Sequence, residues 1–187
     1  DEDPYQISAD GSKLLYVRSP ADGLGELCVR RMGDTTSREK PKVLLKSLFL
    51  NSTSNGFSPD GRWVVYQSEE SGRPEIYVRP SSGEDRKWPV STEGGTLPAW
   101  SPVGDEIFYL SGMKLLAVPV GAKGEEFVAG DPKVLFENHE IFSFAAAKDG
   151  KRFIAAENPN PGAAPRLDIV VNWFAEVRRK VQEAKGQ

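Results

Sequence analysis

One phrase of nine residues occurs four times along this chain of 187 residues. Each copy combines a turn that contains glycine with a following run of apolar residues, and the copies span 8–16, 58–66, 101–109 and 147–155. The glycines of the turns, Gly11, Gly61, Gly104 and Gly150, are separated by 50, 43 and 46 residues. Self-similarity at this interval indicates repeated units that each form one supersecondary element and stack on the next.

Each copy of the phrase predicts a β-hairpin. Asp60-Gly61 between two apolar runs is a strong hairpin signal, because glycine accepts a positive φ and aspartate tolerates it. Pro59, just before Asp60, presets a turn dihedral and ends the preceding strand. In the third copy Val103 replaces the aspartate, and in the fourth Ala147 replaces the serine, but both copies keep the glycine. We therefore expect a hairpin in all four units.

Further apolar runs complete each unit. A third strand is predicted at 27–29, 76–78, 115–118 and 169–171, and a fourth at 43–45, 88–90 and 134–136. Four short strands in about 46 residues are typical of a β-propeller blade, whereas a sandwich would not repeat one phrase at this interval. The sequence therefore predicts an all-β fold, a partial β-propeller of about four blades of four antiparallel strands, the last with three. The predicted blades span about 1–50, 51–92, 93–137 and 138–173.

The last residues follow a different pattern. Between 174 and 184 the alternation is lost, and Phe174, Val177, Val181 and Ala184 fall on one face at helical spacing. Glu176 precedes Lys180 by four residues, a spacing that supports a helix. We expect a short amphipathic C-terminal helix and tail over 174–187.

The charge balance and the cysteine count exclude several classes. Twenty-four basic residues against 27 acidic ones give a net charge of −3, so no electrostatic footprint for nucleic acid is present. No apolar run approaches the roughly 18 residues that span a bilayer, so direct membrane insertion is not expected. Cys28 is the single cysteine, which excludes an internal disulfide framework.

The candidate catalytic residues do not form a convincing site. His139 is the only histidine, and a catalytic triad would have to join it to residues such as Ser143 and Asp149. Its neighbours include two acidic residues, so a solvated side chain is the favoured interpretation. Gly23-Leu24-Gly25 lacks the third glycine of a dinucleotide motif, and zinc and phosphate-loop motifs are absent. We expect no enzyme activity, no catalytic residue, no metal site and no cofactor.

Two other sets of residues have a structural and a functional interpretation. Asp10, Asp60, Asp105 and Asp149 could suggest calcium, but turn carboxylates that accept hydrogen bonds from their own backbone are favoured. Cys28 lies in an apolar run and is expected to be buried rather than reactive.

Aromatic residues recur at equivalent positions. Phe57 and Trp100 precede a turn, and Tyr16, Tyr66 and Tyr109 end the second strand, so all five are expected to pack between blades. Trp63 and Trp88 are less regular, which leaves open whether they contact a partner.

The basic residues 178–180 are expected to lie on a solvated helix face rather than to bind lipid or nucleic acid. The glycosylation triplet at 51–53 has meaning only in a eukaryotic secretory setting.

The segments 57–80, 91–110, 148–155 and 169–180 carry a family resemblance. They resemble the TolB-like, WD-repeat-like β-propeller family, and more narrowly the C-terminal half of propellers attached to bacterial membrane-anchored serine/threonine kinases and winged-helix regulators. The phrase 170–176 resembles the usual end of such chains. Because propellers of this family have about six blades, the resemblance implies the C-terminal part of a larger protein, with open blade edges that favour self-association.

The resemblance also carries the functional expectation. It implies a non-catalytic interaction or sensor module of a bacterial signalling protein, located in the periplasm or otherwise outside the cytoplasm. A protein partner or small ligand would bind through rim loops at 19–25, 68–74, 110–114 and 157–166. The alternatives are a scaffold in a cell-envelope complex and an accessory propeller of a prolyl-oligopeptidase-like hydrolase. The missing Gly-x-Ser-x-Gly motif weighs against an enzyme.

Overall fold

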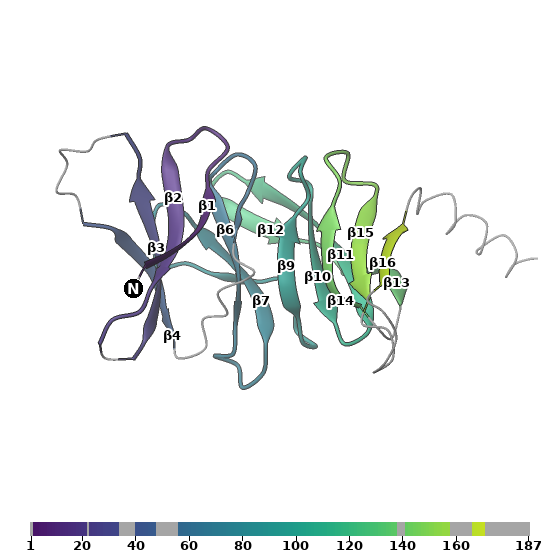
Figure 1. Ribbon diagram of the computed structural model, residues 1–187. Coiled ribbons are helices and arrows are strands. Elements are labelled where there is room, and N and C mark those ends of the chain that lie inside the picture. Colours follow the sequence, from purple (N-terminus) through teal and green to yellow (C-terminus); the bar gives the residue numbers. More distant parts are fainter. Residues whose placement is uncertain are drawn as a thin grey trace, which may run out of the picture.

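The computed structural model describes residues 2–21, 23–33, 40–47, 56–137, 141–157 and 166–170. In these residues all regular structure is β, arranged as four antiparallel sheets that follow one another in chain order. The first and fourth sheets lie at opposite ends of the row, so the sheets do not close a ring (Figure 1). The predicted all-β, partial β-propeller fold is confirmed. The helix predicted over 174–187 lies outside the described residues.

The first two sheets are four-stranded meanders, in which each strand pairs with its neighbours in the chain. The first contains β1 (Glu2–Ile7), β2 (Lys13–Arg18), β3 (Gly25–Arg31) and β4 (Lys42–Ser47). The second contains β5 (Gly56–Phe57), β6 (Trp63–Ser68), β7 (Glu75–Pro80) and β8 (Trp88–Pro89). These strands include the apolar runs that the sequence pattern predicts, except that β8 ends at Pro89, one residue before the end of the predicted run 88–90.

The third sheet has one strand more than the pattern predicts. It contains β9 (Thr96–Trp100), β10 (Glu106–Ser111), β11 (Lys114–Lys123) and β13 (Lys133–Glu137), with β12 (Glu126–Ala129) in addition. The first part of the long β11 pairs with β13 and its last four residues pair with β12. The fourth sheet contains β14 (Ile141–Ala146), β15 (Phe153–Glu157) and β16 (Arg166–Val170), three strands as expected.

The repeated phrase forms the same turn in every sheet. The amide of Gly61 donates to the carbonyl of Ser58 at 2.8 Å, and the equivalent bonds in the other three sheets measure 2.8–2.9 Å. The four turn glycines have φ between 66° and 82°, a conformation that residues with a side chain adopt only at a cost. This requirement explains why glycine is present in every copy, including those that lack the aspartate or the serine.

Three apolar clusters hold neighbouring sheets together. Because side chains alternate along a strand, Val64 and Tyr66 of β6 face the first sheet, whereas Trp63 and Val65 face the third. A third cluster joins Phe108 and Leu110 of β10 to the fourth sheet. The inner strands β1, β5, β9 and β14 are neighbours from sheet to sheet, as expected for blades arranged about a common axis.

Most of the aromatic residues at equivalent positions lie in these clusters. Phe57 and Tyr66 are buried between the first and second sheets, and Tyr109 is buried between the second and third. Trp100 is partly buried against the same second cluster. Tyr16 is also buried, at 2% exposure. The prediction that these rings pack between blades is confirmed for Phe57, Tyr66, Tyr109 and Trp100, whereas Tyr16 belongs to none of the three clusters.

In the part of the chain that the structure describes, no helix is long and apolar enough to cross a membrane.

Candidate functional site

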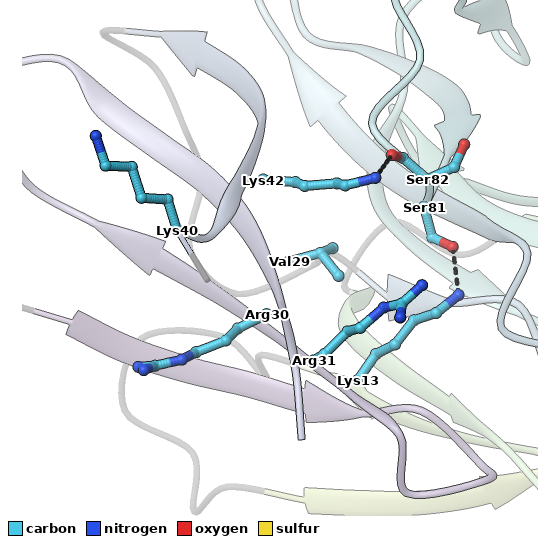
Figure 2. A pocket seen from close by; sticks show the side chains of 8 residues that line it. All are labelled: Lys13, Val29, Arg30, Arg31, Lys40, Lys42, Ser81 and Ser82. Carbon is cyan, nitrogen blue, oxygen red and sulfur yellow. Dashed lines mark hydrogen bonds between the residues drawn. The ribbon is translucent and has the colours of Figure 1, made fainter. Parts of the chain in front are cut away.

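A pocket rich in cations lies where the first and second sheets meet. Its volume is about 150 Å³, and it is lined by Lys13, Val29, Arg30, Arg31, Lys40, Lys42, Ser81 and Ser82 (Figure 2). Five of these eight side chains are cationic, and among the described residues no carboxylate lines the pocket. We call this set of residues the cation pocket.

Strand pairing brings the cations of the first sheet together. Lys13 is the first residue of β2, and it pairs with Arg31, the last residue of β3. Lys42 begins β4 and pairs with Val29 on the other side of β3. Since neighbouring strands are antiparallel, the start of β2, the end of β3 and the start of β4 lie at one end of the sheet.

The second sheet closes the pocket through direct hydrogen bonds. The ammonium of Lys13 donates to the carbonyl of Gly61 and to Oγ of Ser81, both at 2.9 Å. The hydroxyl of Ser81 donates in turn to the carbonyl of Gly61 at 2.7 Å. Lys42 donates from Nζ to the carbonyl of Ser82 at 2.7 Å. These acceptors are neutral, and the carboxylates that interact with the two ammonium groups, Asp10 for Lys13 and Glu84 for Lys42, do not line the pocket.

The two arginines of β3 point in different directions. Consecutive residues of a strand face opposite sides of the sheet, and Figure 2 shows the guanidinium of Arg31 beside Lys13 and toward Ser81, whereas Arg30 and Lys40 point away from this group. Both arginines are exposed, and neither guanidinium has an acceptor among the described residues. A guanidinium with free donors binds planar or tetrahedral oxyanions in a bidentate manner.

The arrangement favours binding of anions over catalysis. Like charges gathered in a concave site create a positive local potential, which attracts anions even though the whole chain is acidic. Among its described lining residues the pocket has no histidine or carboxylate to act as a general base. The Ser81 hydroxyl already donates to a carbonyl and accepts from Lys13.

The four aspartates of the repeated phrase lie in turns. Asp10, Asp60 and Asp149 each accept a hydrogen bond from the amide two residues further on, at 3.0–3.1 Å. The hydroxyl of Ser8 and the bonds from Ser12 lower the pKa of Asp10 to about 2. Asp105, which follows the glycine, instead accepts from the hydroxyl of Ser101 at 3.0 Å. The described residues contain no group of three or more histidine, cysteine or acidic side chains that could hold a metal ion.

The catalytic alternative gains no support from geometry. Ser143 lies in β14 and Asp149 in the turn of the fourth sheet, but His139 lies outside the described residues. Cys28 is fully buried in β3, and its thiol lies 3.7 Å from the carbonyl oxygen of Glu26.

The predicted rim loops lie at the other end of the sheets from the cation pocket. The loops at 68–74 and 110–114 join the second and third strands of their sheets, whereas the pocket lies beside the turns that join the first and second strands. Two hollows occur near these loops, one of about 490 Å³ beside Arg73 and Glu75 and one of about 740 Å³ beside Glu93 and Glu137. Most of the loop at 157–166 lies outside the described residues.

An aromatic cluster fills the interface between the second and third sheets. The ring of Trp63 lies 5.3 Å from that of Trp88 and 5.5 Å from that of Phe127, and Trp100 lies 6.2 Å from Phe127. Trp63 is only 6% exposed, so it packs between sheets. Phe127 belongs to β12, the strand that the repeat pattern does not predict, although the two-residue turn Gly124-Glu125, with Gly124 at a φ of 64°, is a local hairpin signal.

Comparison with known proteins gives the class of the fold. Neither a family model nor a curated protein matches the chain. Among solved structures, TolB from Acinetobacter baumannii is 20% identical with a TM-score of 0.69, over 90% of this chain and 40% of that one. An oligogalacturonate lyase in complex with manganese is 14% identical with a TM-score of 0.65, over 92% and 51%. The β-propeller domain of the trilobed protease from Pyrococcus furiosus is 18% identical with a TM-score of 0.56, over 93% and 58%.

These likenesses define the chain as a β-propeller module. More specifically, its fold is similar to that of TolB, in agreement with the resemblance noted in the sequence. The chain spans between 40% and 58% of the length of these three structures. At such low identity they establish the fold alone, and the function has to be argued from the site.

Proposed function

We propose that this chain is a non-catalytic β-propeller interaction module that binds an anionic group of a protein partner or small ligand in the cation pocket. The observation that carries the proposal is the gathering of five cationic side chains without a carboxylate among the described lining residues. Sites of this composition recognise anions through charge-assisted hydrogen bonds. This positive charge is local to the pocket, since the chain as a whole carries a net charge of −3.

The rigidity of the pocket supports a binding role. Lys13, Arg31 and Lys42 all project from strand residues, and Lys13 and Lys42 are already held by acceptors of the second sheet. A buried apolar cluster that includes Val29 and Val64 joins the two sheets. Binding to such preorganised groups costs little conformational entropy.

The wider setting is proposed from the resemblance in sequence. Segments 57–80 and 91–110 resemble propellers of bacterial membrane-anchored serine/threonine kinases and winged-helix regulators. We place the module, as a sensor or interaction domain, in a larger bacterial signalling protein, on the extracytoplasmic side. The likeness to TolB is consistent with this setting.

A thermal-shift panel tests the binding role. The purified chain is mixed with small anions, acidic peptides, and neutral and cationic compounds of similar size, and the double variant Arg30→Gln with Arg31→Gln is measured beside it. We expect anionic compounds alone to raise the melting temperature, and the double variant to lose the effect. The proposal fails if no anion stabilises the protein, or if the chain hydrolyses chromogenic esters or peptides.

The likeness to TolB favours a scaffold in a cell-envelope complex as a second candidate. A scaffold that binds through a broad surface would capture its partner equally well with and without the two arginine changes, and small anions would not stabilise it. Affinity capture with the wild-type chain and the double variant, side by side, therefore separates the two functions.

A further inference from the structure

We infer that Lys13, Arg31 and Lys42 form the inner part of the cation pocket and bind one compact tetrahedral dianion, a phosphate ion or the phosphate group of a small monoester. The inference rests on the proposed function and names the ligand class of the same site. Arg30 and Lys40, which point away in Figure 2, form the outer part and contribute only to the surrounding potential.

The free donors of the inner part can be counted. An ammonium has three N–H groups; Lys13 uses two of them on Gly61 and Ser81, and Lys42 uses one on Ser82. One donor therefore remains on Lys13 and two on Lys42. The guanidinium of Arg31 adds its planar set of donors, none of which has an acceptor among the described residues.

The origin of these donors favours a tetrahedral ligand. Lys13 and Arg31, a directly opposed pair on β2 and β3, extend side by side, whereas Lys42 approaches from β4, on the other side of β3 (Figure 2). A carboxylate offers two oxygens in one plane and a single negative charge. A phosphate group offers three or more oxygens and a charge of about −1.5 to −2 at neutral pH, which matches three separate cationic groups better.

The size of the pocket favours a compact group. The pocket has a volume of about 150 Å³, enough for several water molecules. This space accommodates a phosphate group. Buried Val29 forms an apolar wall, which lowers the local dielectric and strengthens the ionic hydrogen bonds.

Titration calorimetry with the full chain tests the assignment. The probes are inorganic phosphate, phenyl phosphate and acetate, and the variants are Arg31→Gln and the matched control Arg30→Gln, which removes the same charge from the adjacent residue. We expect phosphate and phenyl phosphate to bind the wild-type chain at least 10-fold more tightly than acetate. Arg31→Gln should weaken phosphate binding at least 10-fold, and Arg30→Gln less than threefold.

A second measurement uses the charge of the ligand. Binding of phenyl phosphate should weaken as the pH falls below about 6, where the dianion of a phosphate monoester takes up a proton. Because both arginines are exposed, the variants should keep the wild-type circular dichroism spectrum and melting temperature. Tighter binding of phenyl phosphate than of phosphate indicates a monoester as the ligand, and the reverse order indicates the free ion.

The contrary outcomes separate this inference from the proposed function. If Arg31→Gln and Arg30→Gln lost the same affinity for phosphate, the anion would bind to a diffuse positive surface, and the three-residue site would be overturned. Tight binding of acetate without binding of phosphate, again dependent on Arg31, would overturn the dianion assignment but leave anion recognition intact. If none of the anions binds, both the inference and the proposed function fail.

Discussion

Gly150, in the turn of the fourth sheet, lies against Ser101, in the turn of the third. A Cβ atom added to Gly150 would come within 3.2 Å of the hydroxyl oxygen of Ser101. Gly104 has the same relation to Pro59, with an added Cβ at 3.4 Å from its ring, and an added Cβ on Gly61 would lie 3.8 Å from that of Ser8. The repeated phrase therefore both closes a hairpin and contacts the preceding sheet.

Substitutions of two turn glycines, Gly11 and Gly150, separate the closing of the hairpin from the contact with the preceding sheet. Gly11 and Gly150 have φ of 70° and 66°, but an added Cβ at Gly11 would meet no atom within 4 Å. Gly11→Ala should therefore cost about 1 kcal/mol for the left-handed backbone. Gly150→Ala should cost about 1 kcal/mol more, because Ser101 has to move to make room. Urea denaturation of both variants measures the difference in the free energy of unfolding. Equal losses of stability would contradict the contact between the turns of the third and fourth sheets.

The fold was predictable because its signals are local. A turn such as Pro59-Asp60-Gly61 and the apolar run after it lie within nine residues, so the hairpin can be recognised without knowledge of the rest of the chain. The strand β12 was missed because it pairs with an extension of β11, the third strand of its unit, and this hairpin lies outside the pattern that the other units share.

The cation pocket was not predictable from local signals. Lys13 and Ser81 are 68 residues apart in the chain, and their contact depends on how the second sheet stacks on the first. The pairing of Lys13 with Arg31 depends on a register that is set by the loop between β2 and β3 as well as by the apolar pattern. The net charge of −3 also conceals a local cluster of cations.

The aromatic cluster gives β12 a structural role that can be measured. Phe127 is 5% exposed and contacts the rings of Trp63 and Trp100, so Phe127→Ala should cost about 2–4 kcal/mol through lost burial and the cavity left behind. Val128, its neighbour on the other face of the hairpin, is 39% exposed, and Val128→Ala should cost less than about 1 kcal/mol. Chemical denaturation followed by tryptophan fluorescence compares the two variants. Similar losses of stability would mean that the β11–β12 hairpin does not support the interface between the second and third sheets.

Glu75 should make stability depend on pH. Its buried carboxylate accepts hydrogen bonds from the Ser91 hydroxyl, from Nε of Arg73 at 2.7 Å and from the amide of Gly94 at 3.0 Å. Burial raises the pKa of Glu75, but these bonds outweigh it and hold the pKa below the ordinary value. The stabilisation is therefore complete above the unfolded-state pKa of about 4.3 and is lost as the pH falls through the lower folded-state pKa. Glu75→Gln should cost about 1–3 kcal/mol at pH 7 and flatten the acid side of a pH–stability curve.

The pKa of Glu106 is shifted in the direction opposite to that of Glu75. Burial, and then the negative charge of Asp105, raise the pKa of Glu106. The folded protein therefore disfavours the ionised form, and its stability decreases as the pH rises through the raised pKa. Glu106→Gln should stabilise the protein at pH 7 and have little effect near pH 4. Urea denaturation at both pH values measures this, and a loss of stability at pH 7 would show that the carboxylate has a stabilising partner.

The hydroxyl of Tyr66 should be dispensable for stability. Tyr66 is fully buried, its ring stacks on that of Tyr77 at 5.7 Å, and its hydroxyl has no hydrogen-bond partner among the described residues. Burial raises the pKa of Tyr66 well above its ordinary range, so the group remains a neutral phenol. Tyr66→Phe keeps the ring contacts and removes an unsatisfied polar group, so the free energy of unfolding should stay the same or rise by up to about 1 kcal/mol.

A hydroxyl with two partners gives the matched control for Tyr66. The buried Ser91 hydroxyl donates to Glu75 and accepts from the amide of Ile76 at 2.8 Å, so Ser91→Ala removes the partner of the buried Ile76 amide and one of the three hydrogen bonds to the Glu75 carboxylate. This change should cost about 1–3 kcal/mol. Both variants are compared by urea denaturation at pH 7. If Tyr66→Phe lost as much as Ser91→Ala, the Tyr66 hydroxyl would have to make a stabilising hydrogen bond in solution, and the interface between the first two sheets would be more polar than its buried side chains indicate.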